Sequence, residues 1–555
     1  MKRKNGTLYT LIIMFLFVAL LTWFFPVTVY QTEFANQGMA RVGLMELFTY
    51  PTYTFYNFIY VFIFLLLVGG LYGILKNIKA YRVLVERIAN RVKERETFYI
   101  IVTILVLSVV VSFTGFTYEL LAIMPFIATI ALLNKRDKVT AALMTVGPIV
   151  AGAIGNTFSV PIAGVFVNGL QIDYKDLLVS KIILLLLSCI VLIIAVLLHN
   201  KKTKETELED ELFFIPEKVT DKEKVRVWPL VVILGCFALV KLLGSIGWQT
   251  VFGLTFFTDL KGKIEAYPLF SKLVMFIVFG LTVVIMLIKY IVNKKKDKDI
   301  TLRKSIGTFG VVVFIISIVI LTLVTVKVFL EDAFKVTTIF TKGYNALGFN
   351  NVTIKDLFGE MVALGEWTYS EYIVWLFVLE LVLMIGYKVK VNDAIENAGN
   401  GMKKVLYATL VCMFAYTILV LTSNNPIMLS ILKPLINLTN STTVAPVIRI
   451  FIYTFVTLIS SFMNCDFSYI TYGVFNLSFA ANSFAGNTSM LTIVGLMHQG
   501  SMGLALLIAP TSIPMLFALN TLNLSYKEWL KKTWLLFVVL LYLVLVASIV
   551  ALLIY

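Results

Sequence analysis

One membrane-length apolar stretch of this chain is interrupted at its centre, and the interruption constrains the fold more than any other feature. Residues 139–170 are long enough to cross a bilayer, but the run Gly-Ala-Ile-Gly-Asn-Thr-Phe-Ser-Val-Pro at 152–161 breaks the helical pattern. Inside lipid, a broken backbone is tolerated only where it faces protein or a water-filled cavity. A second break, Ala-Pro-Thr-Ser-Ile-Pro, lies at 509–514. Paired breaks in two parts of a chain point to the binding site of a transporter.

The composition is that of a multi-pass membrane protein. Of 555 residues, 59% are hydrophobic and 14% are charged, whereas soluble domains average about 45–50% and about 25%. The net charge of +15 does not indicate nucleic-acid binding, because the cations lie in short loops between apolar segments. The same loops predict a cell-membrane protein with a cytoplasmic N-terminus and an extracytoplasmic C-terminus.

Two regions show the same order of parts. Each contains a span, a short or surface helix, a polar-centred hairpin, a broken span and a final span. By loop charge, one region begins outside and the other inside, which predicts an inverted repeat. The first repeat is predicted at 53–199, with span 53–75, surface helix 76–96, hairpin 97–134, broken helix 139–170 and span 177–199. The second is predicted at 405–555, with span 405–421, short helix 427–438, hairpin 444–481, broken helix 488–519 and span 534–553. The other predicted regions are 1–52 (first span 8–30 and outer loop) and 200–404 (linker and scaffold spans 228–247, 268–291, 305–328 and 369–387, with a short helix 392–402).

The predicted fold is therefore an all-α polytopic membrane protein of about 11 spans. It has an inverted repeat, two re-entrant helical hairpins and two broken transmembrane helices. A span needs about 20 residues, and the hairpin arms are each shorter. Two short complete spans in place of each hairpin remain an alternative.

The breaks and hairpin centres predict a binding site for a small charged solute. A helix that stops inside the membrane leaves unpaired N–H groups at one end and C=O groups at the other. The first attract a carboxylate and the second a cation such as Na⁺, which we expect near Asn156 and Thr511. Packing of small residues is the alternative role for these side chains. The candidate substrate- and ion-binding residues are Thr114, Gly115, Thr117, Glu119, Gly155, Asn156, Thr157, Ser159, Asn464, Asp466, Ser468, Pro510, Thr511 and Ser512.

Two acids and one histidine are the most informative of the polar residues. An ionised side chain at a helix centre costs about 2.5–3.5 kcal/mol, so Glu119 and Asp466 are candidates for binding a cation, a proton or a substrate amine. Two acids facing one cavity favour a cationic or zwitterionic substrate over a dicarboxylate. Hairpin tips lying in water are the alternative. His498 is either a proton relay or a hydrogen-bonded packing residue.

Five stretches resemble one carrier family. They are Leu-Leu-Leu-Val-Gly-Gly-Leu-Tyr-Gly-Ile-Leu at 65–75, the run from Thr117-Tyr118-Glu119 to Pro125, Gly155-Asn-Thr-Phe-Ser-Val160, Pro510-Thr-Ser512 and Tyr526-Lys-Glu-Trp-Leu530. Together they resemble the YfcC-type carriers, also called C4-dicarboxylate anaerobic carriers (DcuC-like), of the ion-transporter superfamily. The resemblance implies hairpins and broken helices that meet at a midplane site and move elevator-like against a scaffold. It also implies C4-dicarboxylates, basic amino acids or related small carboxylates as substrates.

These observations predict a secondary active transporter for a small carboxylate-bearing solute. An amino acid, including a basic one, is the first expectation, and a C4-dicarboxylate or short-chain organic acid is the alternative. A non-transporting membrane sensor or scaffold is the alternative of another class. We expect no enzyme, cofactor or metal site, because the chain has two histidines, no phosphate-binding loop and four scattered cysteines. The expected partners are the bilayer and the solute, while Na⁺ or H⁺ coupling, symport or exchange, and a homodimer are left open.

Overall fold

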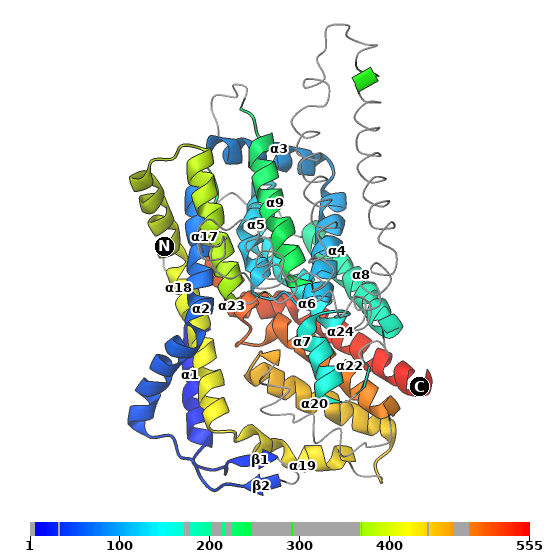
Figure 1. The fold of residues 1–555 in the computed structure, drawn as a ribbon. Helices are drawn as coiled ribbons and strands as arrows, with labels where there is room; N and C mark the ends of the chain where they lie inside the picture. The colour runs from blue at the N-terminus through cyan, green and yellow to red at the C-terminus, as the bar shows by residue number, and fades with distance from the viewer. Residues whose placement is uncertain are drawn as a thin grey trace, which may run out of the picture. The chain divides into compact units, whose positions relative to one another are not determined.

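The computed structural model places most helices of the predicted regions, and its elements keep the labels of Figure 1. The chain divides into two compact units, one of Met1–Leu242 with Thr368–Tyr555 and the other of Leu243–Trp367. The predicted spans 268–291 and 305–328 lie almost wholly outside the described residues. The structure describes residues 6–30, 34–170, 172–173, 178–202, 214–216, 225–246, 290–291, 293, 367, 369–440, 443–467, 469 and 488–554.

The N-terminal span is shorter than predicted. Helix α1 (Gly6–Leu21) has 16 residues, about 24 Å of helix, and ends well before the predicted limit at 30. Pro26 cannot continue a helix, and the β-branched and aromatic residues that follow favour an extended strand. Strand β1 (Thr28–Tyr30) pairs antiparallel with β2 (Phe34–Asn36), with Val29 opposite Ala35. This small hairpin is the one departure from the all-α prediction among the described residues.

Two long helices, α2 (Leu44–Leu75) and α18 (Val391–Asn424), lie against each other over much of their length (Figure 1). The predicted separation of a short helix 392–402 from a span 405–421 is wrong, because α18 runs unbroken through both. Its glycines do not end the helix, and Gly401 allows α2 to approach. A Cβ on Gly401 would lie 2.1 Å from the Gly69 carbonyl oxygen, and one on Gly73 would lie 2.1 Å from that of Asn397. Residue numbers rise along one helix as they fall along the other, so α2 and α18 are antiparallel.

The surface helix and the first hairpin follow α2. Helix α3 (Lys79–Glu94) confirms the predicted amphipathic helix, with valines and alanines buried and most cations outward. The hairpin consists of α4 (Glu96–Thr114), the short 3₁₀ turn η1 (Glu119–Ala122) and α5 (Met124–Leu133). Its arms are unequal, at 19 and 10 residues, so α4 alone reaches about 28 Å. Whether the hairpin is re-entrant stays a prediction.

The first broken helix has the predicted interruption. Helix α6 (Lys138–Ile154) ends at the break, and α7 (Val160–Gly164) and the π-helical turn η2 (Val165–Gly169) continue after it. The membrane-length helix α8 (Leu178–Lys202) returns. Two further helices of this unit are α9 (Trp228–Ser245), whose last residues pass into the other unit, and α17 (Tyr369–Gly386).

The C-terminal part contains α19 (Met428–Asn440), α20 (Pro446–Met463), α22 (Thr488–Ile508), α23 (Ile513–Thr521) and α24 (Tyr526–Ile554). Helices α22 and α23 are the second broken helix. From Met490 to Thr521 they are buried, so together with α6 they form the core of the unit. The second arm of the hairpin predicted at 444–481 lies largely outside the described residues.

Eight helices in the described part of the chain are long and apolar enough to cross a membrane. This agrees with an all-helical multi-pass protein. Matched elements of the two predicted repeats pack antiparallel, as an inverted repeat requires: α2 with α18, and α6 with α22. The latter pair follows from Gly503 facing Ile154 while Gly495 faces Phe166 in η2. The complete repeat and the count of 11 spans stay predictions.

Candidate functional site

The first break is bonded to the first hairpin through Ser112, near the end of α4. The backbone carbonyl of Ser112 accepts hydrogen bonds from the N–H groups of Thr157 (3.0 Å) and Phe158 (3.3 Å). Its hydroxyl donates to the carbonyl of Gly155 at 2.7 Å and lies 3.0 Å from the Thr157 hydroxyl. Backbone groups that the helix break releases are therefore partnered by the hairpin arm rather than by lipid.

The remaining polar side chains of this break are buried, and the end of α6 is bonded to α22. Asn156 is 3% exposed, and its Oδ1 accepts a hydrogen bond from the Ser159 hydroxyl at 2.8 Å. Gln499 in α22 donates its Nε2 to the Ile154 carbonyl at 2.8 Å. Its Oε1 is buried and has no partner among the described residues. Gln499 thus links the first broken helix to the second, a role that its sequence position alone did not reveal.

Gly155 serves packing as well as the break. A Cβ on this residue would lie 2.4 Å from the Cα of Leu185 in α8. The chain at Gly155 therefore touches the backbone of a neighbouring helix, and no side chain fits there. The packing alternative holds for this glycine, whereas the polar side chains beside it form the hydrogen bonds described above.

The second break is bonded in the same way to the end of α20, the described arm of the predicted second hairpin. The hydroxyl of Thr511 accepts a hydrogen bond from the N–H of Cys465 (3.1 Å) and donates to the carbonyl of Phe462 (3.3 Å). Asn464 donates its Nδ2 to the Thr422 hydroxyl of α18 at 2.7 Å. In each half, a threonine of the broken helix is therefore joined to the end of its hairpin arm.

Pro510 and Ser512 complete this second turn. The Ser512 hydroxyl donates to the Leu506 carbonyl at 2.8 Å, and its backbone carbonyl accepts from the Leu516 N–H at the start of α23. Pro510 lies in the turn itself, where it offers no N–H to a helix. The predicted site residue Ser468 lies outside the described residues.

The tip of the first hairpin is a tight turn around its acid. Gly115 ends α4 in a left-handed conformation with φ 76°, which glycine adopts without strain. The Thr114 hydroxyl accepts from the Phe116 N–H (3.2 Å), and the Glu119 carboxylate accepts from the Thr117 N–H (3.0 Å). Glu119 is thus held by its own turn, half-buried, rather than free in water.

A lysine that the sequence interpretation left without a role lies beside Glu119. Lys241 of α9 donates to the Glu119 backbone carbonyl at 3.4 Å and interacts electrostatically with its carboxylate. Its Nζ lies 5.0–5.5 Å from the ring centres of three aromatic residues of α2, the hairpin tip and α17, namely Phe64, Phe116 and Tyr372. A cation over aromatic faces is stabilised by about 0.5–2 kcal/mol. Glu119 therefore has a cationic neighbour, and its charge is offset.

The acid of the second hairpin lies in a small cavity at the second break. Asp466 accepts a hydrogen bond from the Tyr469 N–H at 2.9 Å and is close enough to Tyr118, of the first hairpin tip, to interact electrostatically. The ring of Tyr118 lies 6.4 Å from that of Tyr416 in α18. The cavity, of about 10 Å³, holds roughly one water-sized occupant. Its lining residues are Ala415, Tyr416, Leu419, Asn464, Cys465, Asp466, Thr511 and Ile513.

The two breaks are neighbours in a shared core but are staggered along it. The end of α6 at Ile154 packs on Gly503, which precedes the second break by six residues, about 9 Å of helix. The predicted face-to-face meeting is thus offset: the first break lies against the middle of α22. His498 is buried beside Gln499, with its ring 5.6 Å from that of Phe467 in the second hairpin. No group of three or more His, Cys, Asp or Glu side chains among the described residues is placed to hold a metal.

Membrane-length helices around two interrupted helices, each bonded to the end of a neighbouring helix, are typical of membrane transporters. The chain belongs to the C4-dicarboxylate anaerobic carrier family, DcuC, whose model matches residues 35–354 and 346–553. This confirms the resemblance seen in the motifs, and it makes the chain a membrane transporter. A crystal structure of the Alcanivorax borkumensis YdaH transporter is similar at 12% identity over 98% of each chain, with a TM-score of 0.38. No curated protein matches the chain.

Proposed function

We propose that the chain is a secondary carrier of C4-dicarboxylates, driven by a co-transported cation or by exchange. The observation that carries the proposal is the matched pair of breaks, each joined through a threonine to its own hairpin. The family match over both halves supports a dicarboxylate as the solute. The lysine beside Glu119 supports it too, because the argument for a cationic substrate assumed two uncompensated acids.

A cation suits the cavity at the second break. Asp466, Asn464 and Thr511 supply a carboxylate, an amide oxygen and a hydroxyl at its wall, and hard cations prefer such oxygen ligands. The Oδ1 of Asn464 is buried and lacks a partner among the described residues. A volume near that of one water admits a monatomic ion but not a four-carbon diacid. In this conformation, then, the cavity serves coupling rather than the solute itself.

The proposed movement is elevator-like, with α2 and α18 as the static part and the breaks with their hairpins as the moving part. The close glycine crossing of α2 and α18 supports a rigid scaffold. The hairpin tip carrying Tyr118 and Glu119 touches that scaffold through side chains. Such contacts can be exchanged more easily than interlocked backbones.

Uptake into proteoliposomes tests this proposal. Purified protein would be supplied with labelled succinate, fumarate, arginine or a neutral amino acid, under a Na⁺ gradient, under a proton gradient, or with unlabelled succinate inside for exchange. We expect succinate and fumarate uptake that each diacid competes away. Amino-acid uptake without dicarboxylate uptake would reassign the substrate. Binding of succinate without any uptake in the three conditions would favour the sensor alternative.

A further inference from the structure

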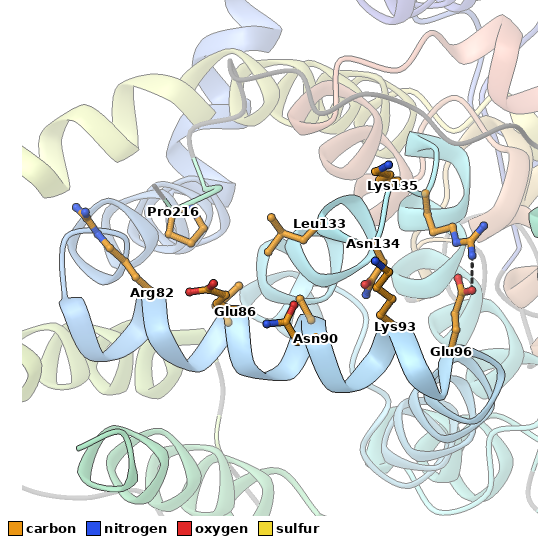
Figure 2. A pocket seen from close by; sticks show the side chains of 12 residues that line it. Arg82, Glu86, Asn90, Lys93, Glu96, Leu133, Asn134, Lys135 and Pro216 are labelled. Atoms are coloured by element: carbon orange, nitrogen blue, oxygen red, sulfur yellow. Dashed lines mark hydrogen bonds and ion pairs between the residues drawn. The ribbon is translucent and has the colours of Figure 1, made fainter. Parts of the chain in front are cut away.

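A second cavity lies apart from the breaks, between the surface helix α3 and the turn that joins α5 to α6. Its volume is about 270 Å³, and Figure 2 shows the side chains that line it. Among the described residues that line it, four side chains are cationic and two are acidic, so this part of the wall carries a net positive charge. The cations are Arg82 and Lys93 from α3, and Lys135 and Arg136 from the turn; the acids are Glu86 and Glu96.

The guanidinium of Arg136 is held in place, and one of its nitrogens is buried without an acceptor. It forms an ion pair with Glu96, whose other oxygen accepts a hydrogen bond from Asn200 at 2.9 Å. The Nε of Arg136 is buried and has no acceptor among the described residues. An unpartnered buried donor is unfavourable, and in native structures such a group often marks a bound water or ion.

The other cations are positioned by backbone geometry. Arg82 donates its Nε to the Lys76 carbonyl at 2.6 Å, across the end of α2. Lys135 has φ 59° in a turn closed by hydrogen bonds from its own N–H to Leu132 and from that of Arg136 to Ala131. Lys93 is exposed at the rim. Binding here would need little reordering of the anchored residues, which lowers the entropic cost.

We propose that this pocket binds a phosphate-bearing anion. Arginine and lysine side chains are the usual partners of phosphate oxygens, and Lys93, Lys135 and the fixed guanidinium of Arg136 lie on the pocket wall. The volume is just below the range of about 300–1,000 Å³ typical of small-molecule sites, which fits a lipid headgroup or a small phosphorylated solute. Because basic amphipathic helices such as α3 bind the surface of anionic membranes, the headgroup of an anionic lipid is one expected ligand. The site is independent of the carrier proposal.

Binding measurements on the full chain test the proposal. The purified protein would be titrated with inorganic phosphate and glycerol 3-phosphate at constant ionic strength, with succinate as the carboxylate comparison. It would also be placed in nanodiscs of phosphatidylcholine with or without phosphatidylglycerol, with bound lipid counted by native mass spectrometry. The test variant is Lys93→Gln with Lys135→Gln. The matched control, Arg87→Gln with Arg91→Gln, removes two exposed cations of the same helix that do not line the pocket.

We expect saturable binding of at least one phosphate-bearing probe. The affinity should fall about tenfold or more in the test variant, which corresponds to about 1.4 kcal/mol, and less than about twofold in the control. Binding of the soluble probes assigns a free solute, and binding of phosphatidylglycerol alone assigns a lipid. Equal losses in both variants would mean diffuse surface charge and would overturn the proposal. So would succinate binding as tightly as phosphate, or no binding of any probe. Monodisperse elution of both variants verifies that they fold.

Discussion

Replacing Gly401 by alanine tests the helix crossing on which the scaffold rests. The new Cβ would lie 2.1 Å from the Gly69 carbonyl oxygen, 2.9 Å from its carbon and 3.0 Å from the Gly73 Cα. All three are backbone atoms, so no side chain can move aside. The two helices must separate, by about 1 Å if the Cβ is to reach ordinary contact with that oxygen. Overpacking of this kind costs about 1–3 kcal/mol, and more where backbone must shift.

Gly399 provides a matched control two residues away in the same helix. An added Cβ there meets nothing within 4 Å. Alanine is a better helix former than glycine by about 1 kcal/mol, so Gly399→Ala should stabilise the protein. We therefore expect thermal unfolding in detergent, followed by tryptophan fluorescence, to rank Gly399→Ala at or above the wild type and Gly401→Ala clearly below it. Equal transition temperatures for the two variants would refute the close crossing of α2 and α18.

Three further predictions concern the site and its surroundings. Lys241→Gln should raise the KM for dicarboxylate uptake about tenfold, because Glu119 loses its cationic neighbour. The control Lys404→Gln, on the exposed side of α18, should leave the KM unchanged. An unchanged KM in both variants would remove Lys241 from the site. The ring of Tyr118 lies 6.4 Å from that of Tyr416, and the ring of Phe58 lies 4.2 Å from it. In the Cys465→Ser background, a cleavable thiol cross-linker that joins Tyr118→Cys to Tyr416→Cys should stop transport until it is cleaved. The same cross-linker between Phe58→Cys and Tyr416→Cys should not, because only the first pair joins the proposed moving part to the scaffold; transport through both cross-links would contradict the elevator. Asp137 caps α6, and although its burial opposes ionisation, hydrogen bonds from His199 (2.9 Å) and Thr140 hold the pKa of its carboxyl below the usual value. Its contribution is therefore present above the unfolded-state pKa and is lost as the pH falls through the folded-state pKa. Asp137→Asn should be less stable than the wild type at pH 7 by about 1–2 kcal/mol, and the gap should close as the pH falls below the unfolded-state pKa of about 3.9. A pH-independent gap in unfolding temperature would contradict this.

The interruptions and the surface helix could be predicted from the sequence because local chemistry dominates there. The first break carries Gly155, Asn156, Thr157 and Ser159 in close succession, all of weak helix propensity, and α3 carries its apolar residues at helical spacing. The end of α1 was harder to place, because hydropathy does not distinguish Val27 to Tyr30 as strand from the same residues as helix.

The continuity of α18 could not be predicted for a different reason. The run Ala-Gly-Asn-Gly at 398–401 has weak helix propensity and, taken alone, reads as an interruption. Tertiary packing overrides that preference, because α2 crosses α18 at Gly401. The partner's backbone supplies the interaction, and no local pattern contains it.

The candidate site was predicted in its residue types but not in its connections. The threonines and small polar side chains of both breaks were identifiable, since they interrupt apolar runs. The links made by Ser112, Gln499 and Lys241 join residues far apart in the chain, and each looks like an ordinary polar residue within its own segment. A lone intramembrane lysine was the one available signal for Lys241, and its partner could not be named without the fold.

The most direct test of the central claim is the initial rate of labelled succinate uptake in proteoliposomes. The claim is that the threonine links between each break and its hairpin hold the transport site. With equal amounts of reconstituted protein, Thr157→Val and Thr511→Val should each lower the rate about tenfold, as the loss of about 1.4 kcal/mol from one or two buried hydrogen bonds implies. Ser548→Ala, which removes a buried hydroxyl bonded within α24, should leave the rate within about twofold. Wild-type rates in both threonine variants would contradict the account.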